Sequence, residues 1–135
     1  MDINYVHSEL LECSRYGEVD DLKLLLKEAK DNGIQFNINY ADEGGNTALH
    51  KASANGHEEC MKVLFELGAE MLRNLNGNLP THWAAQNGKL NSLQFLIQFY
   101  TVDILSKNDF GVSVLSCAFQ SNNPDVIAIC LSHPS

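Results

Sequence analysis

The chain has 135 residues, the size of a single domain that can bury a core of its own. Its nine Lys and Arg and seventeen Asp and Glu residues give a net charge of −8, which argues against nucleic-acid binding, since that needs clustered basic residues. No apolar run approaches the ~20 residues that span a bilayer, and the N-terminal sequence lacks the basic and apolar regions of a secretory signal. We therefore expect an intracellular protein, cytoplasmic and/or nuclear, with no nucleic-acid or membrane partner.

The first expected helices lie within SELLECSRYGEVDDLKLLLKEA, residues 8–29, a faint copy of the units that follow. A long connection, KDNGIQFNINYADEGG, occupies residues 30–45. Ile34, Phe36 and Ile38 alternate there with polar residues. This period of two predicts an extended, strand-like finger.

The next unit, GNTALHKASANGHEECMKVLFELGA at 45–69, predicts two short helices at about 48–55 and 58–67. Thr47 can cap the first helix with its hydroxyl, and Gly56 can end it. Acidic residues open the second helix, where the helix dipole favours them. A lone helix pair of this size buries too little apolar surface to be stable, so such units must stack.

The third unit repeats the second at an offset of 32 residues, with GNLPTHWAAQNG at 77–88 matching GNTALHKASANG at 45–56. The Thr and the Leu have changed places, so that Leu79 holds the cap position and Thr81 replaces a core Leu. We interpret this swap as tolerated drift that thins the packing between units, with His82 bonding locally as His50 does. A fourth, divergent unit covers 108–131.

These units carry a family resemblance. DEGGNTALHKASANGHEECMKVLFELGAE resembles an ankyrin repeat almost position by position, and NGNLPTHWAAQNGKLNSLQFLIQF resembles the next one. The resemblance implies an all-α ankyrin-repeat solenoid of stacked helix-turn-helix units with short β-hairpin-like loops. We expect a single domain over 1–135, with repeats at approximately 5–38, 42–73, 74–106 and 108–135.

The last expected helix, PDVIAICLSHPS, has almost no charge, although a terminal repeat should show a polar outer face. We expect either that its apolar face meets something or that the chain is the N-terminal part of a longer protein. A monomer is the expected state, with a weak dimer through this C-terminal helix as the alternative.

No pattern in the chain predicts an active site. His50 and His82 are equivalent positions in helices expected to pack ~8–10 Å apart, too far to converge on one metal ion. The Asp-Phe-Gly at 109–111 has no companion kinase motif. The four cysteines fall on core-facing helical positions, where thiols are usually inert: Cys13, Cys60, Cys117 and Cys130. We expect no enzyme, no metal and no cofactor in this chain, and leave open a catalytic domain beyond residue 135.

The resemblance implies that a partner docks on the concave face, formed by the loop tips and the exposed side of the first helix of each unit. Transferred position by position, it implies these partner-binding residues: Glu43, Asn46, Leu75, Asn76, Asn78, Trp83, Gln86, Asn87, Asp109, Phe110 and Gln120. Leu75 and Phe110 are apolar exceptions in a polar set. Trp83 is expected to be partly exposed, either as a binding hot spot or as a filler of the space left by Thr81.

The favoured function is a non-catalytic protein–protein interaction module, a repeat scaffold that binds a partner of unknown identity on the concave face. One alternative is a regulatory or substrate-recruiting N-terminal domain of a larger enzyme, such as a methyltransferase, kinase or ubiquitin ligase. A second alternative is an acidic chaperone for a basic client such as a ribosomal protein or a histone. Binding of such a client should fail steeply with added salt.

Overall fold

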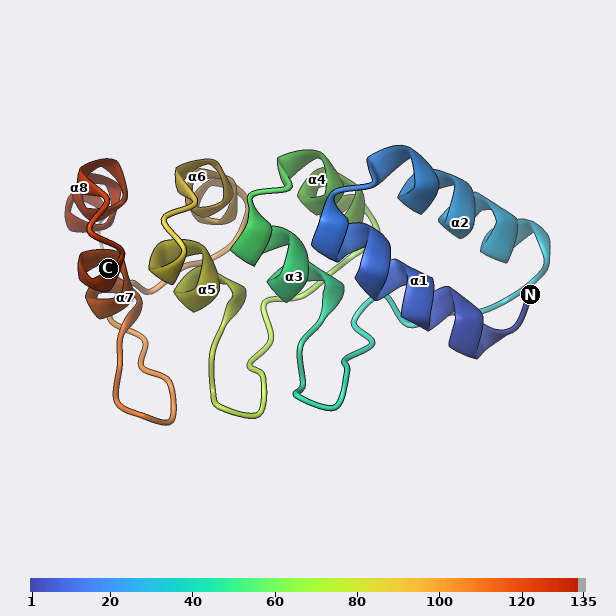
Figure 1. Ribbon diagram of the computed structural model, residues 1–135, viewed down its shortest axis with the longest axis horizontal. Coiled ribbons are helices and arrows are strands. Elements are labelled where there is room, and N and C mark those ends of the chain that lie inside the picture. The colour runs from blue at the N-terminus through green and yellow to red at the C-terminus, as the bar shows by residue number, and fades with distance from the viewer. Residues whose placement is uncertain (134–135) are drawn as a thin grey trace.

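Residues 1–133 are described by the computed structural model, and they form eight helices arranged as four consecutive helix-turn-helix pairs (Figure 1). The last two residues of the fourth predicted repeat, 134 and 135, lie outside this described part. The pairs are α1 (Ile3–Tyr16) with α2 (Val19–Asp31), α3 (Ala48–Asn55) with α4 (Glu58–Glu66), α5 (Pro80–Gln86) with α6 (Leu90–Phe99), and α7 (Val114–Ser121) with α8 (Pro124–Ser132).

The pairs stack side by side in two layers. The first helices α1, α3, α5 and α7 form one row and the second helices α2, α4, α6 and α8 form another, as Figure 1 shows. Three loops leave the stack on the same side, one before each of α3, α5 and α7. The architecture is the predicted all-α solenoid, in which each pair buries its apolar side chains against its neighbours.

Local sequence explains where the first helices begin. Thr47 caps α3 as predicted, because its Oγ1 accepts a hydrogen bond from the backbone N–H of His50 at 3.3 Å. Leu79, at the same position of α5, has no side-chain acceptor. Pro80 follows it at the start of α5, where its missing N–H leaves no donor unpaired.

The core lies between the two layers and runs through all four pairs. Its largest fully buried aliphatic side chains are Leu10, Leu22, Leu49, Met61, Leu64, Leu93 and Leu96. The four cysteines are buried and unpaired, as expected for core-facing positions. Burial raises the pKa of Cys13 and Cys60 to about 11, with neighbouring carboxylates adding to the effect, so both thiols stay protonated and unreactive.

The expected strand-like finger is wrong for residues 30–40, and Ala41 forms only an isolated antiparallel bridge with Thr47. Helix α2 continues to Asp31, and residues 34–38 pair with no strand in the described part of the chain. Phe36 and Ile38 instead pack against the core, and the backbone N–H of Asn37 donates to Nε2 of His7 at 2.9 Å. A lone strand would leave its backbone without a ladder partner, whereas folding back buries the apolar side chains and finds an acceptor on α1.

Packing is thin beside Thr81, as its Leu-to-Thr exchange predicts. Thr81 is almost fully buried, yet a hollow of about 230 Å³ opens next to it, with Leu79, Met71 and Val102 also on its wall. A Leu side chain would project further into this space than Thr does. The hollow lies where the start of α5 meets the connections that follow α4 and α6.

The last pair, α7 and α8, has one face that no following helix pair covers, and this end face exposes an apolar side chain. Ser53 and Ala85 are fully buried beneath the next pair, whereas Phe119 at the equivalent position of α7 is 52% exposed. This agrees with the expectation that the last repeat lacks a polar outer face. Among residues 1–133, no helix has the length and the apolar composition that crossing a membrane requires.

Candidate partner-binding site

Each of the three loops is closed by its own Asp or Asn side chain. Oδ1 of Asp42 accepts hydrogen bonds from the backbone N–H groups two and four residues further on, both at 2.9 Å. Asn74 and Asn108 repeat this arrangement in the next two loops, with distances of 2.9–3.0 Å. None of these three residues was among the predicted binding residues, although their spacing follows the repeat.

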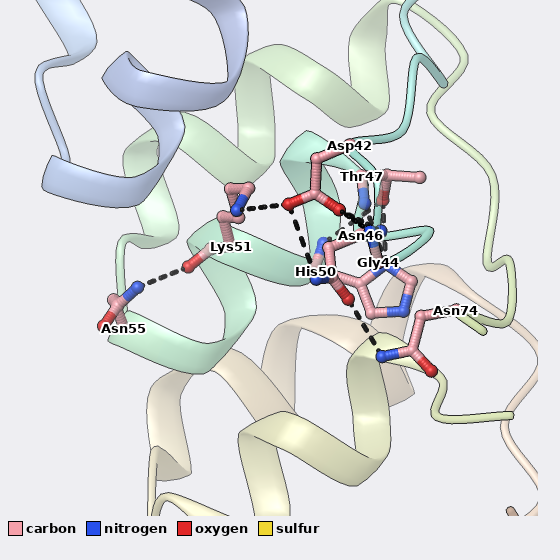
Figure 2. A network of polar contacts seen from close by, with 8 residues as sticks. All are labelled: Asp42, Gly44, Asn46, Thr47, His50, Lys51, Asn55 and Asn74. Atoms are coloured by element: carbon pink, nitrogen blue, oxygen red, sulfur yellow. Dashed lines mark hydrogen bonds and ion pairs between the residues drawn. The ribbon is translucent and has the colours of Figure 1, made fainter. Parts of the chain in front are cut away.

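Side-chain amides tie each loop to the next. Nδ2 of Asn74 donates to Oδ1 of Asn46 in the preceding loop at 2.9 Å, a link drawn in Figure 2. Nδ2 of Asn108 donates in the same way to Oδ1 of Asn78 at 2.8 Å. Asn46 and Asn78 were predicted to contact a partner, but the structure uses their side-chain oxygens within the stack.

Backbone hydrogen bonds join the tips of neighbouring loops. The N–H of Leu75 donates to the carbonyl oxygen of Gly44 at 3.0 Å, and the N–H of Asp109 donates to that of Asn76 at 3.0 Å. The three tips therefore form a connected row rather than three independent loops.

This close approach requires glycine at one position in each of the first two loops. A Cβ added to Gly45 would stand 2.8 Å from the backbone nitrogen of Leu75, and one added to Gly77 would stand 2.8 Å from that of Asp109. Both glycines also adopt a positive φ, 77° and 76°, which disfavours other residues. Replacement of either glycine would push two loop tips apart.

His50 holds the start of its own helix and the following loop. Its Nδ1 accepts from the backbone N–H of Thr47 at 3.2 Å, and its Nε2 lies 2.8 Å from the carbonyl oxygen of Asn78. These partners require the neutral ring with its proton on Nε2. The predicted local bond is confirmed, and the second bond reaches the next repeat.

His82 repeats this arrangement one unit later. Its Nδ1 accepts from the backbone N–H of Leu79 at 3.0 Å, and its Nε2 lies 2.9 Å from the carbonyl oxygen of Ser106. Burial lowers the pKa of both His50 and His82. Both rings therefore serve as neutral structural links, and neither is free for chemistry.

The polar network behind the first loop includes an ion pair. Nζ of Lys51 lies 3.0 Å from Oδ2 of Asp42, as Figure 2 shows. Burial raises the pKa of Asp42, but the N–H bond from Asn46 and the Lys51 ammonium outweigh it and lower the pKa overall. Asp42 thus stays ionised and closes its loop.

Trp83 lies at the position of Lys51 in the next unit, and its indole is half-buried. Its ring meets that of His50 edge to face, with centroids 5.3 Å apart and an interplanar angle of 71°. One edge of Trp83 therefore belongs to the junction between α3 and α5, while the rest reaches solvent. The expected partial exposure is confirmed, but Trp83 does not line the hollow beside Thr81, so the structure gives no support to its role as a filler of that space.

Most of the remaining predicted residues are open to solvent. Leu75 and Phe110 are 71% and 73% exposed, more than any other large apolar side chain in residues 1–133. The other exposed members of the predicted set are Glu43, Asn76, Gln86, Asn87, Asp109 and Gln120. Asn87 also donates from Nδ2 to the carbonyl oxygen of Ala54 at 3.2 Å, so it links α5 to α3.

The structure adds a groove that the sequence analysis missed. It lies between α1 and the first loop, has a volume of about 480 Å³, and is lined by residues that include Leu11, Glu12, Arg15, Tyr40 and Glu43. The first repeat is degenerate in sequence, so its helix α1 was left out of the predicted surface. Alignment of α1 with α3 would have pointed to Glu12 and Arg15.

The comparisons with known proteins agree with this architecture. A family model described as ankyrin repeats (many copies) matches residues 10–65 and 49–97, so the chain belongs to the ankyrin repeat family. It is 28% identical over 132 residues to human transient receptor potential cation channel subfamily A member 1, covering 97% of this chain and 11% of that protein. It is 34% identical over 87 residues to mouse ankyrin repeat domain-containing protein SOWAHD, covering 63% of this chain and 27% of that protein.

The chain thus spans only a small part of the length of either relative. Membership in the family has a general meaning for function. Ankyrin repeats generally mediate protein–protein interactions and are generally non-catalytic. The partners to be expected are therefore proteins.

Proposed function

We propose that this chain is a non-catalytic module that binds a partner protein on its concave face, formed by the loop tips and the exposed side of α3, α5 and α7. The observation that carries the proposal is the connected row of loops, tied by the Asn74–Asn46 and Asn108–Asn78 amide bonds. A surface held in place in this way loses little conformational entropy on binding.

The side chains on this face suit a protein partner. Trp83, Leu75 and Phe110 expose apolar surface, and aromatic side chains are enriched among residues that dominate binding energy. The exposed Gln and Asn side chains around them can hydrogen-bond to a partner backbone. We therefore assign Trp83 as the central anchor and the two apolar tips as flanking contacts.

Two alternative functions remain, a regulatory domain and an acidic chaperone. The first would use the same surface, and the second would use the overall charge. A regulatory domain of a larger enzyme would present this face to recruit a substrate protein. An acidic chaperone would rely on the net charge of −8 and would need no particular anchor. Salt dependence and the Trp83 side chain separate the chaperone from the concave-face module.

Affinity capture with the chain as bait, at low and at moderate salt, tests the proposal. A partner that survives moderate salt and is lost with Trp83→Ala supports the concave-face module. The matched control is Phe99→Ala, which removes an exposed aromatic ring from α6 in the other layer and should leave capture unchanged. Circular dichroism shows whether both variants keep their helices.

Two outcomes would contradict the assignment. Equal capture by the wild type and the folded Trp83→Ala variant would remove Trp83 from the site. Capture of basic proteins alone, released by salt and indifferent to the variant, would favour the acidic chaperone.

A further inference from the structure

The connection between α2 and α3 includes a stretch that belongs to no helix and no strand, residues 35–40. We call it the connecting segment. Both of its ends are fixed, because the N–H of Ile34 donates to the carbonyl oxygen of Ala29 at 2.9 Å and Ala41 forms a bridge with Thr47. The segment is therefore bounded by two anchors that do not depend on it.

Two hydrogen bonds join the connecting segment to the rest of the described chain, residues 1–133. The N–H of Asn37 donates to Nε2 of His7 on α1 at 2.9 Å, and the N–H of Glu70 donates to Oδ1 of Asn39 at 2.9 Å. The other hydrogen bonds of the segment lie within it. His7 therefore provides its hydrogen bond to α1.

The same histidine supports an aromatic side chain of the segment. The ring of Tyr40 stacks on that of His7, with centroids 4.2 Å apart and an interplanar angle of 9°. His7 is 8% exposed beneath it, whereas Tyr40 is 38% exposed. One imidazole thus accepts from the backbone of the connecting segment and carries its last side chain.

The bond from Asn37 is possible only while His7 is neutral. A neutral imidazole accepts at Nε2 when its proton is on Nδ1, and an imidazolium has no acceptor. Protonation would set two N–H donors against each other and would place a cation in a buried site. It would therefore remove the hydrogen bond between the segment and α1.

No neighbouring charge compensates for this cost. Tyr40 is the titratable side chain in contact with the ring, and the adjoining elements carry carboxylates at positions 9 and 12 on α1 and at positions 42 and 43 in the first loop. None of these charges contributes to the pKa of His7, which is lowered by burial alone.

Release of the connecting segment would leave the repeats in place. The Nε2 bonds of His50 and His82 each join one repeat to the next, and both rings are fully buried. Opening of the segment breaks only its own two hydrogen bonds and the contacts of Phe36 and Ile38, which are partly buried against the core. Such a local opening costs less free energy than separation of two repeats.

We infer that His7 is a pH-sensitive switch whose protonation releases the connecting segment from α1 while the four helix pairs stay stacked. In the open form Tyr40 leaves the wall of the groove between α1 and the first loop, which it lines together with Leu11 and Glu12. The open segment takes up a proton near the ordinary pKa of 6.5, and the closed one resists it. The equilibrium constant for opening therefore rises about ten-fold between pH 7.5 and pH 5.5.

Hydrogen exchange of the ¹⁵N-labelled chain, followed by NMR at pH 7.5 and 5.5, tests the inference. The protection factor of the Asn37 amide, corrected for the intrinsic exchange rate at each pH, should fall about ten-fold at pH 5.5. The amide of Leu64, a fully buried residue of α4, should stay more protected than that of Asn37 at both pH values. This difference shows that the opening is local.

Two variants separate the roles of the ring. The side-chain oxygen of His7→Gln can accept the same N–H but does not titrate in this range, so the protection of Asn37 should no longer depend on pH. His7→Phe keeps a ring for Tyr40 without an acceptor, so protection should be low at both pH values. The matched control is His133→Gln at the end of α8, which should keep the pH dependence of the wild type. Circular dichroism shows whether each variant keeps its helices.

Three results would overturn the inference: protection of Asn37 that does not change with pH in the wild type, an equal fall in folded His7→Gln, or equal protection of Asn37 and Leu64. The third result would mean that the segment opens only when the stack unfolds. None of these results bears on the capture experiment with Trp83→Ala.

Discussion

Acid should destabilise the stack through His7, His50 and His82, whose rings each accept a backbone N–H and whose pKa values burial lowers, and His82→Ser should remove up to about a third of that effect. His82 accepts at Nδ1 from the backbone N–H of Leu79, so a proton on Nδ1 would place two donors against each other. Burial lowers the pKa of His82 and of His50, which has the same arrangement. The unfolded chain therefore takes up protons near the ordinary pKa of 6.5 while the folded chain resists them.

The sign and the size follow from proton linkage. The pKa of each histidine is lower in the folded than in the unfolded chain. Its contribution to the free energy of unfolding is therefore fully present well above pH 6.5 and is lost as the pH falls below that value. For each histidine that stays neutral in the folded state, the free energy of unfolding falls by about 1.4 kcal/mol between pH 7.5 and pH 5.5. The three histidines together lower the free energy of unfolding by at most about 4.1 kcal/mol, and His82→Ser leaves about two-thirds of this.

Serine is a suitable replacement because the chain already uses it at this position. Ser116 stands there in the fourth pair, with its Oγ 3.1 Å from Oγ of Ser113. At pH 7.5 the His82→Ser variant should still lose about 1–3 kcal/mol, since the N–H of Leu79 and the carbonyl of Ser106 lose their partner. The informative quantity is therefore the change in the free energy of unfolding between pH 7.5 and pH 5.5.

Urea unfolding followed by circular dichroism at pH 7.5 and 5.5 measures this quantity for both proteins. Leu93→Ala is the control, because it removes a fully buried side chain without changing any titrating group. It should lower the stability at both pH values and keep the wild-type pH dependence. If His82→Ser kept the full pH dependence, the histidine account would be refuted.

Three further predictions concern packing, the loops and association. Thr81→Leu should fill the hollow of about 230 Å³ and raise the free energy of unfolding by about 1 kcal/mol; a loss would show that the hollow cannot accept the side chain. Asn74→Ala should lower it by about 2–3 kcal/mol in urea unfolding, because one side chain makes three loop hydrogen bonds; a neutral effect would contradict the loop network. A monomer is the expected state and a weak dimer through the C-terminal helix the alternative; sedimentation equilibrium should show a monomer at all concentrations, and association that Leu131→Ser abolishes but Phe110→Ser does not would establish the dimer instead.

Part of the candidate binding surface was predictable because exposure at the loop tips follows from the repeat register. Leu75 and Phe110 were expected to be accessible, and they are the most exposed large apolar side chains in residues 1–133. Asn46 and Asn78 were assigned to the same surface, but their side chains accept from the next loop. Sequence position shows that a residue lies in a loop, whereas its hydrogen-bond partner about 30 residues away depends on how the loops stack.

The sequence by itself determined the repeat, the helices and their local caps. The α3 helix occupies 48–55 as predicted, Thr47 caps it, and the cysteines lie in the core. These features depend on neighbours within one helical turn or on the apolar period of a helix, and both can be read along the chain. The exchange of Thr and Leu between the second and third units, which places Leu79 at the cap and Thr81 in the core, can also be read along the chain.

Only the tertiary structure decided the course of residues 32–41, the orientation of Trp83 and the ties between loops. Phe36 packs on the core, and within residues 1–133 its backbone pairs with no strand. The Nε2 bonds of His50 and His82, and the amide links of Asn74 and Asn108, each cross from one repeat to the next. Such contacts join residues 24–30 positions apart, and they form only when the stacked helices bring those residues within hydrogen-bonding distance.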